Sequence, residues 1–116
     1  MDAATAAARC LDRVGAEEGY PFGEEVAVFK VAGKMFALLL DAHPCRLTLK
    51  CDPHLAEALR EQYVAVSPGY HTNKRHWNTV DLDGSVPDDE LDEMIGHSYE
   101  LVVNALPKAQ RTALGF

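Results

Sequence analysis

Two short strand-like segments separated by only two residues constrain the fold of this chain more than any other feature. The segments are VAVFKV (26–31) and KMFALLL (34–40), and both are rich in residues that favour β-structure. They meet at Ala32 and Gly33, and a connection this short is typical of a tight hairpin. The sequence therefore predicts an antiparallel pair of strands over residues 26–40.

The segment CRLTLKC (45–51) alternates strictly between apolar and polar residues. Leu47 and Leu49 would face one side of a strand, whereas Arg46, Thr48 and Lys50 would face the other side. This pattern is typical of a sheet strand with one face toward the core and one toward water. It predicts that the solvent-exposed face is cationic.

The segment HWNTVDL (76–82) alternates in the same way and predicts a fourth strand. Val80 and Leu82 would lie on one face, whereas Trp77, Thr79 and Asp81 would lie on the other. Four strands are thus expected, and two of them carry polar side chains on one face.

Helical spacing of apolar residues predicts helices over roughly residues 3–14, 53–63 and 87–106, and a final short helix after Pro107. Asp52 and Pro53 are a favourable N-cap and first helical residue. The glycine- and proline-containing stretch 15–25 reads as a loop.

The predicted order is a helix, three strands, a helix, a strand and one or two helices. Runs of strands with helices at the ends indicate an α+β fold, in which an antiparallel sheet packs against helices on one face. The length of 116 residues suits a single domain over residues 1–116.

The charge of this chain is distributed unevenly. The formal net charge is −7, which argues against a whole surface that binds nucleic acid non-specifically. Residues 26–80, however, carry seven cations and four acids, whereas both ends are acidic. A dipolar protein with a basic middle segment is therefore expected.

Cytoplasmic residence, without a membrane segment, is the default expectation for this sequence. The longest apolar run, Met35 to Leu40, is far too short to span a bilayer, and the N-terminus lacks the features of a signal peptide. The three cysteines, Cys10, Cys45 and Cys51, are too few for a disulfide framework and indicate reduced thiols.

No metal, cofactor or catalytic motif stands out. Cys45, Cys51 and His54 have the spacing C-x5-C-x2-H, which matches no zinc module. Ser67 and Ser98 lie in plain turn or helix contexts, and no phosphate-binding glycine loop is present. The sequence therefore predicts neither a metal site nor an enzyme.

The segment YHTNKRHWNTV (70–80) concentrates two histidines, adjacent cations and the only tryptophan. Lysine and arginine supply phosphate contacts, and tryptophan and histidine can stack on bases. Exposed sheets also carry such cations for solubility, so both interpretations stay open. We expect Asn73, Lys74 and His76 to have a structural role first, in stabilising the loop and the start of the strand. Trp77 could either belong to the core or contact a partner.

The string PGYHTNKRHWNTVDLDGSVPDDELDEMIGHSYELV (68–103) resembles the signature of the MmcQ/YjbR family. The shared pattern is a proline, a histidine, asparagine-lysine, histidine-tryptophan with a hydrophobic strand, a turn, a proline-acid helix start and a serine-tyrosine pair. FKVAGKMFALL and RLTLKCDPHLAEALREQY also resemble the family, so the likeness covers nearly the whole chain.

This resemblance implies a small cytoplasmic bacterial domain with a frataxin-like (CyaY-like) α+β fold and a double-wing DNA-binding motif. The family assigns no catalytic residues. The polar positions that match its pattern are Lys30, Lys50, His71, Asn73, Lys74, His76 and Trp77.

The leading hypothesis is a DNA-binding protein that uses the basic sheet face and the 70–77 loop. Its candidate contact residues are Lys30, Arg46, Lys50, His71, Asn73, Lys74, Arg75, His76 and Trp77. The alternative is a non-catalytic interaction or regulatory module of unknown partner, which could bind an acidic partner through the basic face or a basic partner through residues 88–93. Metal handling and an unrecognised enzyme are weaker rivals. A monomer or weak dimer is expected.

Overall fold

A computed structural model of this chain describes residues 1–70 and 72–116. The elements follow in the order α1 (Ala3–Leu11), β1 (Ala16–Gly19), β2 (Val26–Val31), β3 (Lys34–Leu40), β4 (Arg46–Lys50), α2 (Pro53–Gln62), β5 (Val66–Pro68), β6 (Trp77–Asp81), α3 (Asp88–Asn104) and α4 (Lys108–Ala113). The strands form one antiparallel sheet in the order β1-β2-β3-β4-β6-β5. The predicted α+β class is confirmed.

The central hairpin forms as the sequence predicts. Ala32 and Gly33 have φ angles of 50° and 77°, and two adjacent residues with positive φ give the turn whose twist suits a two-residue hairpin. Further along β2 and β3 the register shifts, so that Phe29 pairs with Ala37 but Lys30 pairs with Met35. The additional residue in β3, Phe36, is fully buried, and a bulge of this kind increases the local twist of a strand.

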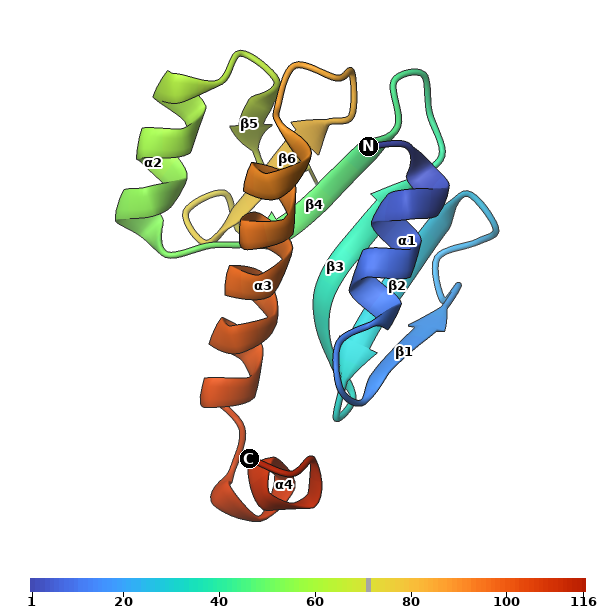
Figure 1. Ribbon diagram of the computed structural model, residues 1–116, viewed down its shortest axis with the longest axis vertical. Coiled ribbons are helices and arrows are strands. Elements are labelled where there is room, and N and C mark those ends of the chain that lie inside the picture. The colour runs from blue at the N-terminus through green and yellow to red at the C-terminus, as the bar shows by residue number, and fades with distance from the viewer. Residues whose placement is uncertain (71) are drawn as a thin grey trace.

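Helices cover one face of the sheet and leave the other face open (Figure 1). Helix α3 packs on β3 and β4, α1 packs on β1 and β3, and α2 packs on β5 and β6. The side chains that fill the space between helices and sheet include Phe29, Phe36, Leu47, Leu91 and Ile95, all of which are nearly or fully buried.

The sequence-based boundaries differ from the structure at three places. The stretch 15–25, read as a loop, contains β1, and residues 66–68, read as a helix break, form β5. Both are short edge strands that exist because they pair with β2 and β6. Helix α1 ends at Leu11 rather than 14, because the chain tightens there through a hydrogen bond from the Arg13 amide to the Cys10 carbonyl.

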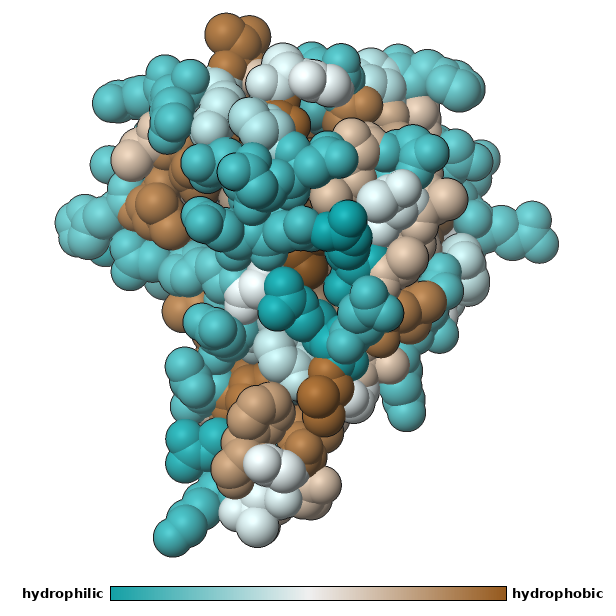
Figure 2. All heavy atoms as spheres, in the orientation of Figure 1, coloured by the Kyte–Doolittle hydropathy of each residue, from teal (hydrophilic) through white to brown (hydrophobic). Residues whose placement is uncertain are grey.

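The outer surface of the molecule on the side of the helices is mainly hydrophilic. Hydrophilic side chains prevail over α1 and α3, and hydrophobic side chains gather near α4 at the lower end of the molecule (Figure 2). Within residues 1–70 and 72–116, no helix combines the length and the apolar character needed to cross a membrane.

Candidate functional site

The open face of the sheet is hollowed into an apolar groove of about 340 Å³. Its floor comes from β2, β3, β4 and β6, and includes the side chains of Val26, Leu38, Leu40, Thr48 and Thr79. An apolar concavity with a few polar groups is the usual form of a binding site. We call this hollow the open-face groove.

Two exposed aromatic side chains line the open-face groove. Phe22 comes from the loop between β1 and β2 and is 68% exposed, and Tyr70 follows β5 and is 52% exposed. Thr72 lies beside them, and its buried hydroxyl has no hydrogen-bond partner in the described part of the chain. Large aromatics exposed next to an apolar hollow indicate a surface that contacts another molecule.

A hydrogen-bonded pair of threonines fixes the loop after β5 to the sheet. The hydroxyl oxygens of Thr48 and Thr79 lie 2.8 Å apart, and the Tyr70 amide donates to the Thr79 hydroxyl over 2.9 Å. Gly69 is required at the start of this loop, because a Cβ atom there would lie 2.6 Å from the Cβ atom of Trp77. Tyr70 is thus held at the groove by its own backbone.

The 73–77 turn is fixed by its own polar side chains. Asn73 Oδ1 accepts from the Arg75 amide over 3.0 Å, and Lys74 Nζ donates to the Gly69 carbonyl over 3.0 Å. The expected structural role is therefore confirmed for Asn73 and Lys74. His76 contributes backbone contacts, since its carbonyl accepts from the Cys51 amide over 2.8 Å. Trp77 is half-buried.

Arg60 of α2 holds the same turn from the other side, a role that the sequence does not reveal. Its Nε donates to Asn78 Oδ1 over 2.7 Å, and its guanidinium also donates to the carbonyls of Lys74 and Trp77. Asn78, which is buried, in turn donates to the Ala56 carbonyl. The turn is therefore bound to α2 as well as to the sheet.

The predicted cations of the strands differ in their surroundings. Arg46 lies at the open-face groove, where its Nε is 3.4 Å from a carboxylate oxygen of Asp81. Lys30 lies opposite Glu17 in the register of β1 and β2. Lys50 lines cavities near α3 instead of the groove.

The floor of the open-face groove is apolar, and Thr48, which the sequence places on a solvent-exposed face, is buried. Arg75 is exposed on the 73–77 turn. The prediction for His71 concerns a residue that lies outside the described ones.

The aromatic lining of the groove was missed by sequence reasoning, although two signals were present. Tyr20 and Phe22 occur in a glycine- and proline-rich loop, where no core position explains a large aromatic. Strand 34–40 is apolar on both faces, yet the predicted helices cover only one. Together these signals indicate a second apolar surface on the open face.

The cysteines behave as small apolar residues. Burial is the main cause that raises the pKa of Cys10 to about 12 and that of Cys51 to about 11. The Cys45 thiol donates to the Leu40 carbonyl over 2.9 Å, and burial raises its pKa as well. Thiols with raised pKa values are poor nucleophiles and poor metal ligands at neutral pH.

Comparison with known proteins matches residues 11–101 to the model of the YjbR family. The protein YjbR of Escherichia coli (strain K12) is 38% identical over 107 residues, which cover 90% of each chain. This chain belongs to the YjbR family.

Solved structures agree with the assignment to the YjbR family. DR2400 of Deinococcus radiodurans is 39% identical and superposes with a TM-score of 0.93 over 99% of this chain and 88% of that one. A Pseudomonas syringae protein is 27% identical, with a TM-score of 0.78 over 87% of this chain and 98% of the other. The E. coli relative is an uncharacterized protein, and its name assigns no function.

The serine-tyrosine pair that resembles the YjbR pattern has a structural role. The Ser98 hydroxyl donates to the Phe36 carbonyl at the bulge of β3 and accepts from the Lys50 amide over 2.9 Å. The Tyr99 hydroxyl donates to the Val14 carbonyl, and its ring packs edge-on against Phe36 with 5.4 Å between ring centroids. The pair thus joins α3 to the sheet and to the end of α1.

Proposed function

We propose that this chain binds DNA, preferentially single-stranded, through the open-face groove and the 70–77 loop. The observation that carries this proposal is the pair of exposed aromatics, Phe22 and Tyr70, on an apolar groove that also contains Arg46. Proteins that bind single strands combine aromatic side chains, on which bases stack, with cations that contact phosphates. A duplex would keep its bases stacked inside and would leave these aromatics unused.

The charges predict weak and salt-dependent binding. Arg46 and the exposed Arg75 are cations near the groove and the loop, but Asp81 competes with phosphate for Arg46. The net charge of −7 further opposes a polyanion. We expect dissociation constants of about 10⁻⁴ to 10⁻⁶ M. The logarithm of the association constant should fall with the logarithm of the salt concentration with a slope of about −1.4, as for two phosphate contacts on a single strand.

Fluorescence anisotropy with a labelled single-stranded oligonucleotide and its duplex, at low and moderate salt, tests the proposal. Phe22→Ser and Tyr70→Ser should each weaken single-strand binding about tenfold, since stacking on one aromatic contributes about 1–3 kcal/mol. Phe116→Ser is the matched control, because Phe116 is 61% exposed but lies against Tyr99 at the far end of the molecule. Absence of binding at low salt, or equal loss in all three variants, would refute the proposal.

A module that binds an apolar peptide is the second candidate, and the apolar floor of the groove favours it. A peptide library displayed on phage and selected on this chain would then yield sequences rich in large apolar residues. Their binding should be lost in Phe22→Ser and kept in Phe116→Ser. Selection of no consensus would leave nucleic acid as the better candidate.

A further inference from the structure

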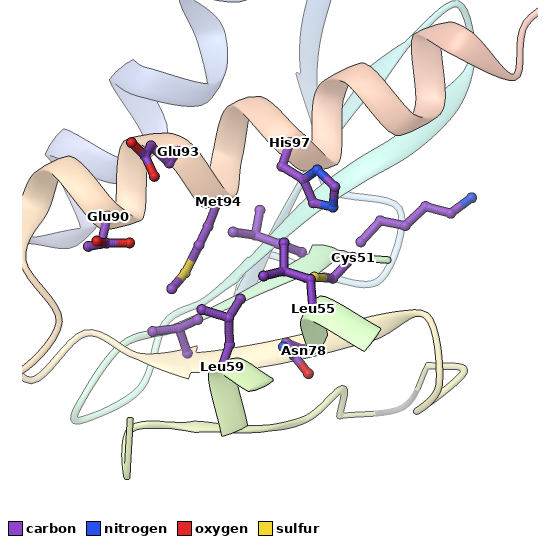
Figure 3. A pocket seen from close by; sticks show the side chains of 11 residues that line it. Cys51, Leu55, Leu59, Asn78, Glu90, Glu93, Met94 and His97 are labelled. Atoms are coloured by element: carbon purple, nitrogen blue, oxygen red, sulfur yellow. The ribbon is translucent and has the colours of Figure 1, made fainter. Parts of the chain in front are cut away.

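A second cavity, of about 270 Å³, lies on the helix-covered side between α2, α3 and the sheet. It exists because α2 packs on β5 and β6 whereas α3 packs on β3 and β4, so the two helices diverge. Its apolar lining consists of Leu49, Leu55, Leu59, Val80 and Met94. We call it the interhelix cavity; Figure 3 shows Met94, Leu55 and Leu59 around it.

The two ends of the interhelix cavity differ in charge. Glu90 and Glu93 lie at one end, and His97 and Cys51 lie at the other (Figure 3). No hydrogen bond or ion pair engages the carboxylates of Glu90 and Glu93 among residues 1–70 and 72–116. Burial, followed by the charges of Glu90, Asp89 and Glu93, raises the pKa of Tyr63 nearby, which indicates a negative potential at this end.

The opposite end of the interhelix cavity carries one lysine, Lys50, beside His97 and Cys51. His97 Nε2 accepts a hydrogen bond from the Asp52 amide over 3.2 Å, so this nitrogen is engaged with the backbone at the start of α2. Burial holds the Cys51 thiol protonated, with its pKa raised to about 11. Lys50 is the cation among the lining residues, against two carboxylates.

We propose that the interhelix cavity binds a small organic cation with an apolar body. Its ammonium group would lie by Glu90 and Glu93, and its apolar body would cover Met94, Leu59 and Val80. The volume equals that of about nine water molecules at about 30 Å³ each, which suits a ligand well below drug size. Leu55, 41% exposed, would lie at the mouth and lose contact with water when the ligand enters.

Three probes of eight carbon atoms each separate the effect of charge from that of hydrophobicity: n-octylammonium, n-octanol and n-octanoate. Binding to the full chain is followed by NMR of ¹³C-labelled methionine methyl groups, because the chain has three methionines. Met94 lines the interhelix cavity, whereas Met35 lines the open-face groove. We expect n-octylammonium to shift the Met94 signal and to bind about tenfold more tightly than n-octanoate.

Charge variants complete the test. The double variant Glu90→Gln/Glu93→Gln should weaken n-octylammonium binding about threefold to tenfold and leave n-octanol unchanged. Glu57→Gln/Glu61→Gln is the matched control, since it removes two exposed charges from α2 that do not line the cavity. Leu55→Trp should reduce binding of all three probes by narrowing the mouth.

The outcomes that overturn this inference are distinct from those that overturn DNA binding. It fails if n-octylammonium leaves the Met94 signal unchanged, if n-octanoate binds equally well, or if both double variants behave alike. A shift of the Met35 signal instead of the Met94 signal would mean that the probe binds in the open-face groove, and it would also overturn this inference. DNA binding is expected to shift Met35 and leave Met94 unchanged, so either proposal can fail alone.

Discussion

The two faces of the sheet are built from the same strands but have different roles. On the helix-covered face, Leu47 is fully buried, and the polar groups present, Ser98 and Asn78, bind the backbone of neighbouring elements. On the open face, Leu38 and Leu40 are only half-buried, and Phe22 is mostly exposed. Apolar residues stabilise the fold on the first face and remain available for contacts on the second.

The difference shows how a strand that is apolar on both sides can serve two purposes. β3 contributes Ala37 and Leu39 to the core and Leu38 and Leu40 to the open-face groove. Only the first pair is covered by a helix. An apolar surface that no helix covers lowers the solubility of a protein. Its presence beside exposed aromatic side chains therefore favours a role in binding.

The largest expected effect comes from truncating one leucine on each face. Leu47→Ala should lower the free energy of unfolding by about 3–4 kcal/mol, because it leaves a cavity in a closed core. Leu38→Ala should cost about 1 kcal/mol, because water already reaches that side chain. Urea unfolding at several protein concentrations measures both. Equal losses would mean that the open face is covered in solution, for example by a second copy of the chain.

Removal of the Ser98 hydroxyl should cause the next largest loss of stability. Ser98→Ala removes the group that satisfies the Phe36 carbonyl and the Lys50 amide, and each buried group left unpaired costs about 1–3 kcal/mol. We expect a loss of about 2–3 kcal/mol and faster hydrogen exchange of the Lys50 amide.

Ser67→Ala provides the control for Ser98 on the edge strand β5. The Ser67 hydroxyl is 3.4 Å from the Thr79 carbonyl and is exposed, so its removal should cost less than about 0.5 kcal/mol. If both alanine variants lose the same stability, the Ser98 contacts do not join α3 to the sheet as described.

Local sequence signals predict the elements whose formation depends on their own residues. The two-residue hairpin at Ala32 and Gly33, the alternation of β4, and the Asp52 N-cap all appear in the structure where the sequence puts them. The strands β1 and β5 were missed because they are short, and their formation depends on the pairing that β2 and β6 offer.

The candidate site was less predictable than the fold, because its contacts join distant segments. The bond from Lys74 to Gly69 and those from Arg60 to the 73–77 turn depend on how loop and helix meet. The pairing of Arg46 with Asp81 depends on the register of β4 and β6. A lysine or arginine in a sequence shows its charge but gives no information about the partner that already neutralises it.

The smallest expected effect on stability, and the sharpest test of the open face, comes from Asp81→Asn. Asp81 and Arg46 are both well exposed, so their ion pair contributes about 0–1 kcal/mol and the fold should be unchanged. Without the carboxylate, Arg46 can contact phosphate, and we expect single-strand DNA affinity to rise about twofold to fivefold. Asp92→Asn changes the net charge equally but releases Arg9, which joins α1 to α3 on the covered side. Anisotropy titrations of both variants separate local from overall charge: an equal rise would assign the effect to net charge, and no rise in Asp81→Asn would remove Arg46 from the interface.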